Sequence, residues 1–326
     1  MKQTVPAREA SSGSGKSATR RRRRSATPAT ASGPSRSGVR ITHADRIVYA
    51  ASGITKLMVA DYYERVAPRL LPHVAGRPLS IVRCPDGTSA SCFFQKHVGE
   101  HMIPGIEVAM IDDSAGRNPY IVANTAQALV GLAQMNALEL HAWSAKAAAI
   151  ERPDTLIFDL DPDPGLSWAT IVTAARRTRS VLDALGLASL VKTTGGKGLH
   201  LVVPLERRHS WDEVKDFAQC VAAHLAKTRP DDFTASLSKT RRRRKIFVDY
   251  LRNARGATAV APYSLRARAE PTVATPLSWD ELSPRTVPGA FTLATVLERL
   301  AKRKDPWADY ERCRQRLTAA MRRSLR

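Results

Sequence analysis

The sequence has few cysteines, no long apolar run and comparatively few acidic residues. Its four cysteines, Cys84, Cys92, Cys220 and Cys313, form no CxxC pair. They therefore argue against a disulfide scaffold or a cysteine zinc site and fit a reducing cytoplasm. No run of about 18 apolar residues predicts a transmembrane helix, and the N-terminus lacks the apolar core of a secretory signal. We expect a cytoplasmic protein without a membrane partner.

Basic residues exceed acidic ones by a wide margin. The 326 residues include 51 Lys and Arg but only 30 Asp and Glu, a formal net charge of +21. This excess indicates a polyanionic partner, most simply nucleic acid. Residues 1–40 hold ten of the cations, including the run Arg20–Arg24, among many small polar residues. Such a composition cannot offset the entropy of ordering, so it predicts a disordered basic arm that serves phosphate binding, solubility or localisation.

Apolar residues make up 43% of the whole sequence, enough for a hydrophobic core. The patterns beyond residue 40 predict mixed α and β structure. Helical patterns cover residues 55–71, 124–135, 167–187, 211–227 and 291–303. Thr55 could cap the first helix, whose apolar side would include Leu57, Tyr62 and Tyr63, and Ser210 with Glu213 forms a capping box for the fourth. Strand patterns cover residues 79–83, 92–97, 137–143, 155–160, 189–193, 199–203 and 245–251. No repeat and no Pro/Gly-rich linker divides residues 41–305, which predicts one compact catalytic domain there. Residues 306–326 are expected to form a basic, helical C-terminal tail.

Two carboxylates stand at the end of one predicted strand. Asp159 and Asp161 are two residues apart in the segment Phe158-Asp-Leu-Asp-Pro162, so both side chains project from one face. Carboxylates this close repel each other unless cations lie between them, and Mg²⁺ or Mn²⁺ suits such oxygen ligands. Asp249, on another apolar strand, would complete a site for two metal ions. The alternative is that the Asp-Pro sequences only form a turn.

A glycine-rich segment, Lys192-Thr-Thr-Gly-Gly-Lys-Gly-Leu-His200, lies between two predicted strands. Glycines let backbone N–H groups approach an anion, and Thr194, Lys197 and His200 add a hydroxyl, a positive charge and a further donor. The segment suits a triphosphate, although it lacks the P-loop residues at positions 191 and 198. An ordinary hairpin turn is the alternative, with His200 as a core histidine.

Aromatic and cationic residues adjoin in the segment Phe93-Phe-Gln-Lys-His97. Aromatic side chains stack on bases at single-stranded sites, but two adjacent phenylalanines also fit a hydrophobic core. Arg46 and Lys56, near the start of the first predicted helix, could bind a phosphate or lie in solvent. His141, on a predicted strand, could be a core histidine.

Together these segments closely resemble the polymerase domain of bacterial DNA ligase D, which belongs to the archaeo-eukaryotic primase superfamily. The resemblance covers about residues 41–285. It rests on the order and spacing of Arg77-Pro-Leu-Ser, Val82-Arg-Cys-Pro-Asp-Gly87, Phe93-Phe-Gln-Lys-His97, Asn136-Ala-Leu-Glu-Leu-His141, Phe158-Asp-Leu-Asp-Pro162, Lys192 to His200, Ile246-Phe-Val-Asp-Tyr-Leu-Arg-Asn253 and Ala261-Pro-Tyr-Ser-Leu-Arg266. It implies an α+β fold, a primase-like core whose central, mostly antiparallel sheet is flanked by helices.

The resemblance also implies a role for each matching residue. The catalytic, metal-binding positions of the family are matched by Asp159, Asp161 and Asp249. Its nucleotide-binding positions are matched by His141, Thr194, Gly195, Lys197, His200 and Arg266. Thr194 stands where relatives often have Ser, so a hydroxyl is kept. The positions that bind the downstream 5′-phosphate and stack on the template are matched by Arg46, Lys56, Phe93 and Phe94.

The implied activity is template-directed nucleotidyl transfer with two metal ions, Mn²⁺ or Mg²⁺, and NTP or dNTP as substrate. The family fills short gaps and extends broken ends in bacterial non-homologous end joining. The implied partners are DNA with 5′-phosphorylated gaps or broken ends, Ku, and a separate ATP-dependent DNA ligase, in association with the nucleoid. No KxDG ligase motif occurs, so we expect no ligase activity from this chain.

Two other functions stay open at this point. A primase of the same superfamily would start chains without a primer, which a priming assay on single-stranded DNA detects. A non-catalytic nucleic-acid-binding protein would act through the arm, the run Arg241–Arg244 and the C-terminal arginines. An extension assay with Mn²⁺ separates that possibility from a polymerase.

Overall fold

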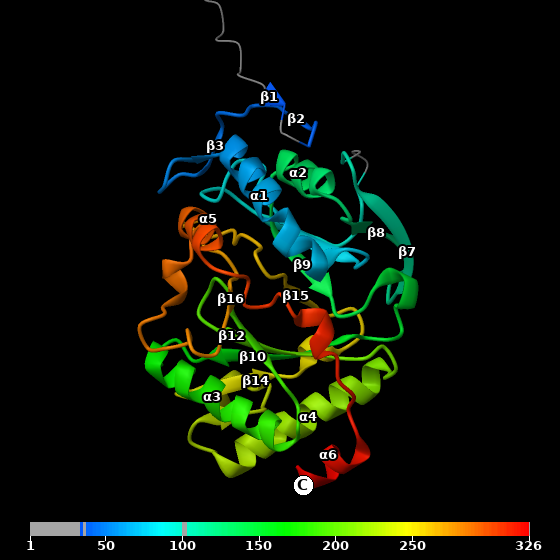
Figure 1. Ribbon diagram of the computed structural model, residues 1–326, viewed down its shortest axis with the longest axis vertical. Coiled ribbons are helices and arrows are strands. Elements are labelled where there is room, and N and C mark those ends of the chain that lie inside the picture. The colour runs from blue at the N-terminus through cyan, green and yellow to red at the C-terminus, as the bar shows by residue number, and fades with distance from the viewer. Residues whose placement is uncertain (1–32, 35–36, 100–102, 326) are drawn as a thin grey trace, which may run out of the picture.

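Two sheets, each with its own helices, make up the body of the protein (Figure 1). The structure is a computed structural model that describes residues 33–34, 37–99 and 103–325. The predicted arm at residues 1–40, with its run Arg20–Arg24, lies almost entirely outside the described residues. Among the helices of the described part, none is both long enough and apolar enough to cross a bilayer.

The first sheet, in the upper half of Figure 1, has the strand order β15-β9-β5-β8-β7, with β6 paired to β5. All its pairings are antiparallel. Its strands are β5 (Leu79–Arg83), β6 (Phe93–Gln95), β7 (Glu107–Asp113), β8 (Gly116–Val122), β9 (Ala137–Trp143) and β15 (Thr258–Val260). Helices α1 (Lys56–Val74) and α2 (Ala126–Gln134) share one hydrophobic core with this sheet.

Helix α1 begins as its sequence predicts. The hydroxyl of Thr55 accepts a hydrogen bond from the N–H of Met58, which satisfies one of the unpaired donors at the helix start. The predicted apolar side is buried at Tyr62, Tyr63 and other positions. Leu57, which was expected on that side, is exposed instead.

The second sheet has the strand order β13-β14-β10-β12-β11-β16, and within the described residues only its β13–β14 pairing is parallel. Its strands are β10 (Thr155–Pro162), β11 (Leu190–Thr193), β12 (Leu199–Pro204), β13 (Phe233–Thr234), β14 (Ile246–Asp249) and β16 (Pro276–Leu277). Helices α3 (Trp168–Ala184) and α4 (Trp211–Thr228) bury their apolar sides against it and lie below it in Figure 1. The predicted capping box of Ser210 and Glu213 starts α4. This sheet confirms the expected fold class.

Shorter elements complete the described chain. The N-terminal part contains β1 (Gly33–Pro34), β2 (Arg40–Ile41), β3 (Ile47–Tyr49) and β4 (Ile54–Thr55). The C-terminal part contains α5 (Leu293–Lys302) and α6 (Ala319–Ser324). The 3₁₀ turns are Ala147–Ala149, Lys239–Arg242, Leu251–Asn253, Pro288–Ala290 and Tyr310–Cys313.

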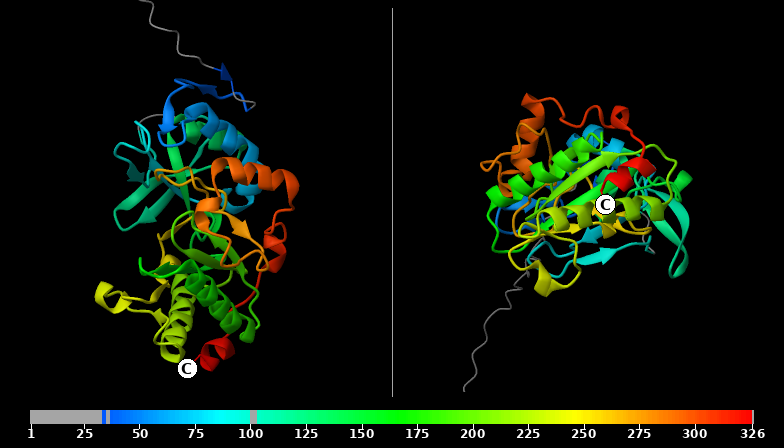
Figure 2. Two further views of the ribbon diagram at one scale, coloured as in Figure 1. Left: turned by 90° about the vertical axis from the view of Figure 1, so that its left-hand side faces the viewer. Right: turned by 90° about the horizontal axis from the view of Figure 1, so that it is seen from below.

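The chain crosses between the sheets repeatedly. It leaves the first sheet after β9, builds most of the second, returns for β15 and then contributes β16 to the second sheet. The left view of Figure 2 shows the two sheets one above the other along the long axis, with the C-terminal segment running beside them. In that segment, Trp307 and Tyr310 are buried and Leu325 packs into the second core. A domain boundary at residue 305 stays a prediction.

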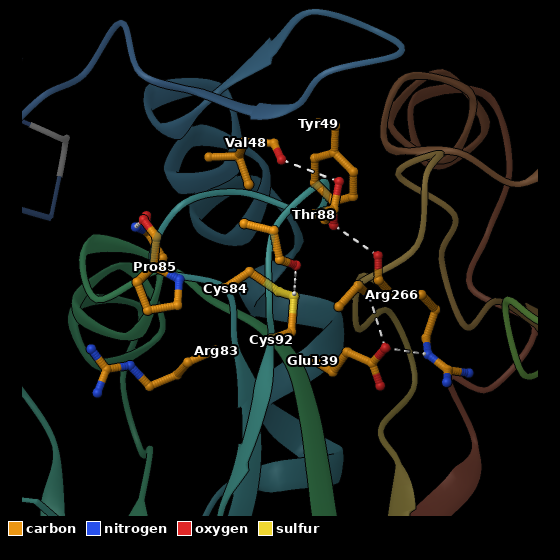
Figure 3. The surroundings of a disulfide bond; sticks show 12 residues. Val48, Tyr49, Arg83, Cys84, Pro85, Thr88, Cys92, Glu139 and Arg266 are labelled. Carbon is orange, nitrogen blue, oxygen red and sulfur yellow. Dashed lines mark hydrogen bonds and ion pairs between the residues drawn. A yellow bond between two sulfur atoms is a disulfide. The ribbon is translucent and has the colours of Figure 1, made fainter.

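Two features differ from expectation. The hairpin of β7 and β8 was not predicted, because β7 exposes apolar residues such as Val108 and Met110 and lacks a clear alternation. A disulfide joins Cys84 and Cys92 (Figure 3), although the scattered cysteines argued against a disulfide scaffold and for a reducing compartment. Antiparallel pairing of β5 with β6 brings together residues that are eight positions apart in the sequence.

Candidate active site

The three predicted carboxylates lie on the neighbouring strands β10 and β14. Asp159 is directly paired with Asp249, and Asp161 lies two residues further along β10. Residues directly opposite each other in an antiparallel pair share a face of the sheet, so all three side chains project together. On the other side of Asp159, His200 of β12 is its paired residue, with its Nε2 3.5 Å from Oδ1 of Asp159.

Two arginines balance the charge of these carboxylates. Nε of Arg252 donates to Oδ2 of Asp159 at 3.0 Å and lies 3.4 Å from Oδ2 of Asp249. Nη1 of Arg242 lies 3.9 Å from Oδ2 of Asp161. Neither arginine was identified from the sequence as a site residue, although Arg252 follows Asp249 by three positions and Arg242 belongs to the basic run.

The pKa values of the carboxylates diverge. Burial raises the pKa of Asp159, but His200 and Arg252 outweigh it and hold this pKa below its ordinary value. Burial and the neighbouring charge of Asp159 raise the pKa of Asp161. Burial likewise raises the pKa of Asp249. Closely spaced carboxylates disfavour each other's ionisation, so their pKa values move apart.

The chemistry of this donor set fits a divalent ion, because Mg²⁺ and Mn²⁺ prefer carboxylate oxygens. In the part of the chain that the structure describes, no three His, Cys, Asp or Glu side chains are already arranged to hold one metal ion. Arg252 supplies the positive charge between Asp159 and Asp249 instead. A divalent ion bound by these carboxylates would add to the compensation of their charge.

The glycine-rich segment forms the turn between β11 and β12. The N–H and the hydroxyl of Thr194 both donate to the carbonyl oxygen of Gly198, each at 3.2 Å. Gly195 has a φ of +65°, and a Cβ there would come within 2.7 Å of the side chain of Arg266. Lys197 is exposed at the tip. The turn is therefore the hairpin that was considered as the simpler alternative, and it also carries the predicted phosphate-binding groups.

Arg266 joins this turn to the first sheet. Its Nη1 donates to the carbonyl oxygen of Thr194, and its Nε lies 3.0 Å from Oε1 of Glu139. Glu139 also contacts Nε2 of His141 at 2.7 Å through its other oxygen. The hydroxyl of Tyr49 donates to the carbonyl oxygen of Arg266 at 2.9 Å, beside the disulfide (Figure 3). Glu139 was missed in the sequence, although it stands two residues before His141 on the same face of a strand.

A cavity of about 250 Å³ brings most of these groups together. Its lining includes predicted residues of both kinds, the carboxylates and the nucleotide-binding groups: His141, Asp159, Asp161, Thr194, Lys197, His200 and Arg266. Arg252 and Arg268 also line it and were not predicted. The cavity therefore combines carboxylates with a cationic wall, as a triphosphate and its metal ions require.

The predicted DNA-binding residues are not part of the cavity lining. Phe93 and Phe94 are 46% and 49% exposed, which rules out the core interpretation for both. The ring of Phe94 meets that of His141 edge to face, with centroids 5.7 Å apart. The exposed pair therefore lies next to His141, one of the predicted nucleotide-binding residues.

Arg46 and Lys56 are neighbours. The N–H of Lys56 donates to the carbonyl oxygen of Arg46, and Nη1 of Arg46 donates to the carbonyl oxygen of Pro85 in the disulfide-closed loop. Lys56 is only 5% exposed, so it does not lie in solvent. Burial and the charge of Arg46 lower the pKa of Lys56 to about 8.

Comparisons with known proteins identify the family. A model of the family described as "LigD, primase-polymerase domain" matches residues 55–307. The chain belongs to this family. This membership confirms the resemblance seen in the sequence, and with it the expected enzyme class, a nucleotidyltransferase.

Individual LigD proteins show how far the similarity extends. The multifunctional non-homologous end joining protein LigD of Pseudomonas aeruginosa is 46% identical over 290 residues, which are 88% of this chain and 34% of that protein. The bifunctional LigD of Bacillus subtilis is 31% identical over 275 residues, 84% of this chain and 44% of that protein. The chain thus spans between a third and a half of the length of these relatives.

A solved structure supports the same family. The polymerase domain of Mycobacterium tuberculosis ligase D in complex with DNA superimposes with a TM-score of 0.78 at 34% identity. The match covers 84% of this chain and 97% of that domain. At this identity, the similarity extends beyond a shared fold to the family itself.

Proposed function

We propose that this chain is a template-directed polymerase that fills short gaps and extends broken DNA ends in bacterial non-homologous end joining. The observation that carries the proposal is the cavity in which Asp159 and Asp161 face Thr194, Lys197 and the neighbouring arginines. Carboxylates and phosphate-binding cations in one cavity fit nucleotidyl transfer. The matching LigD polymerase domain was solved with DNA, which supports DNA as the template.

The residues of the nucleotide side have distinct roles in this proposal. The backbone and hydroxyl of Thr194, the close approach that Gly195 permits, and the charge of Lys197 hold the triphosphate. Arg266, held by Glu139, adds a second cation whose position is set by an ion pair. His141 and His200 complete the wall of the cavity.

Asp159, Asp161 and Asp249 would hold two divalent ions, Mn²⁺ or Mg²⁺. When bound, such ions neutralise phosphate charge and activate a 3′-hydroxyl for in-line transfer. The chain itself orients the triphosphate against the strand ends and favours the ionised form of one of these carboxylates. For Asp159, His200 and Arg252 favour the ionised form by lowering its pKa.

The DNA side of the site is formed by cations and aromatic rings. Arg46 and Lys56 would bind the 5′-phosphate downstream of a gap, and Phe93 and Phe94 would stack on the template. The contact of Phe94 with His141 would couple the template to the incoming nucleotide. We further propose that the protein works in the cytoplasm on the nucleoid, with Ku and an ATP-dependent DNA ligase that seals the ends.

Replacing Asp161 tests the function. We expect Asp161→Asn to reduce nucleotide addition by about 10³-fold or more, because the amide no longer supplies a negative ligand, while DNA binding changes little. The assay measures extension on a 5′-phosphorylated gapped duplex and compares NTP with dNTP and Mg²⁺ with Mn²⁺. The binding of Mn²⁺ itself, followed by its paramagnetic resonance signal, should weaken in the same variant.

Asp183→Asn in α3 provides a matched control, since Asp183 lies outside the cavity lining and pairs with Arg179. It should extend primers normally. Normal extension by the Asp161 variant contradicts the proposal, as does wild-type protein that adds no nucleotide under any condition. Efficient synthesis on single-stranded DNA without a primer would favour a primase.

A further inference from the structure

Four side chains form one row across the second sheet. Lys192 of β11 is directly paired with His200 of β12. His200 is in turn paired with Asp159 of β10, and Asp159 with Asp249 of β14. Directly paired residues share a face of the sheet, so Lys192 stands on the same face as two of the proposed metal ligands. The proposed function assigns it no role.

Lys192 is almost completely buried. Its side chain is 2% exposed, and Nζ has no hydrogen-bond partner in the part of the chain that the structure describes. Burial and the charge of Arg266 lower the pKa of Lys192 to about 7, while Asp159 acts in the opposite direction. Burying an amine that makes no hydrogen bond lowers the free energy of unfolding. A lysine at this position is therefore not explained by a contribution to the stability of the fold.

His200, which is paired with Lys192, also has a buried polar atom without a hydrogen-bond partner among the described residues. Its ring is 3% exposed, and Nδ1 also has no hydrogen-bond partner among the described residues, whereas Nε2 faces Asp159. A neutral imidazole donates through one ring nitrogen and accepts through the other. A donor that lacks an acceptor therefore stands beside an acceptor that lacks a donor, on two directly paired residues.

A small cavity lies beside Lys192, behind the site, and His200 is not among the residues that line it. This cavity of about 50 Å³ is lined by Lys192 together with Thr155, Trp307 and Tyr310. Ala259 and Val260 line both this cavity and the cavity of about 250 Å³ at the candidate active site, so the two cavities adjoin. A volume of this size can hold a water molecule that has polar partners.

We propose that Lys192 is a positioning residue, whose Nζ donates a hydrogen bond to Nδ1 of His200 directly or through one water. This inference rests on the proposed function of the site. With Nδ1 as acceptor, the hydrogen stays on Nε2 and points along the row toward Asp159 and the cavity. His200 then offers a donor to a triphosphate oxygen, whereas the other tautomer would present a lone pair to that anion.

The tautomer of His200 can be measured in the unaltered protein. Nitrogen-15 NMR of the histidine side chains, assigned by comparison with His200→Gln, distinguishes the two neutral forms. We expect a single Nε2–H form in the wild type. An Nδ1–H form overturns the proposal without reference to any activity.

Lys192→Met then removes the donor and keeps the apolar length of the side chain. We expect the melting temperature to stay constant or rise, because an unpaired amine is lost. We also expect His200 to lose its single tautomer and the affinity for ATP with Mn²⁺ to fall about tenfold, the scale of one well-placed hydrogen bond to a charged group. Lys192→Gln, which keeps an N–H donor, should restore part of both properties.

Lys215→Met on the outer helix α4 is the matched control and should leave the tautomer, the melting temperature and ATP binding unchanged. A Lys192→Met variant with the wild-type tautomer and ATP affinity overturns the proposal. A lower melting temperature with unchanged nucleotide affinity does so too, because it assigns Lys192 a purely structural role. If the wild type binds no ATP, the proposed function fails, whereas the tautomer still decides the role of Lys192.

Discussion

At the scale of single residues, burial changes what a charged side chain can do. Lys56 is nearly inaccessible and stands beside a second cation, Arg46, and both effects favour the neutral amine. A phosphate brought to the pair would favour the charged form again. The pair is therefore suited to binding a dianionic terminal phosphate, which compensates both charges at once.

Lys56→Ala should lower the preference for gaps with a 5′-phosphate about tenfold, the scale of a lost charge-assisted hydrogen bond. The preference of the wild type should also weaken as the pH rises from 7 to 9, since the pKa of Lys56 is lowered to about 8 and the amine is charged only below it. Extension of phosphorylated and unphosphorylated gaps at each pH measures both effects.

Lys56→Arg should keep the preference at pH 9, because a guanidinium remains charged there. Lys302→Ala, an exposed lysine of α5, is the control for lost charge. Equal use of both gaps by the wild type at pH 7 would refute the role of Lys56.

At the scale of elements, the loop between β5 and β6 connects the proposed DNA and nucleotide contacts. The disulfide of Cys84 and Cys92 closes it, and the N–H and hydroxyl of Thr88 both donate to the carbonyl oxygen of Val48 (Figure 3). Gly87 packs so closely that a Cβ would lie 2.9 Å from that same oxygen. The loop thus fixes β3 relative to β6, on which Phe93 and Phe94 stand.

Replacing the pair in Cys84→Ser/Cys92→Ser should lower the free energy of unfolding by about 2–3 kcal/mol, as expected for a cross-link that closes a short loop. Denaturant unfolding of both proteins, with and without a thiol reductant, measures the change. The reductant should affect only the wild type.

Cys220→Ser/Cys313→Ser removes the two free cysteines and serves as the control. It should unfold like the wild type. Four reactive thiols in the denatured, unreduced wild type would show that the cross-link is absent and would contradict this prediction.

At the scale of the whole molecule, charge and geometry contribute separately to DNA binding. The net charge of +21 attracts any nucleic acid, but the groups that would distinguish a phosphorylated gap are few and are held by the folded part. Residues 1–32 carry eight cations and one acid, and they precede the pairing of β1 with β2. They can therefore be removed without cutting into the described sheets.

Deleting residues 1–32 should weaken DNA binding at low salt and reduce the dependence of log K on log salt by about one unit for each lost phosphate contact. Titrations between about 50 and 200 mM salt measure this change. Nucleotide addition to bound DNA and the preference for a 5′-phosphate should persist. Loss of nucleotide addition on saturating DNA would place the arm within the catalytic machinery.

Local patterns in the sequence determined most of the helices and strands, because periodicity and caps act over a few residues. Thr55 and Ser210 start their helices where the sequence indicates. The strand expected over residues 245–251 ends at Asp249 instead, because its carboxylate accepts the N–H of Leu251 and turns the chain into a 3₁₀ turn. The sequence also predicted that Asp159 and Asp161 share one face of the sheet, because successive side chains of a strand point to opposite faces.

The sequence by itself also determined the family, since the order and spacing of short motifs are properties of the chain. The tertiary structure alone decided which distant residues meet. Register between strands paired Asp159 with Asp249 and placed Lys192 beside His200. The same folding buried Lys56, set Arg252 between two carboxylates and brought the cysteines of the β5–β6 loop together. These contacts depend on long-range pairing and burial, which no local pattern in a sequence specifies.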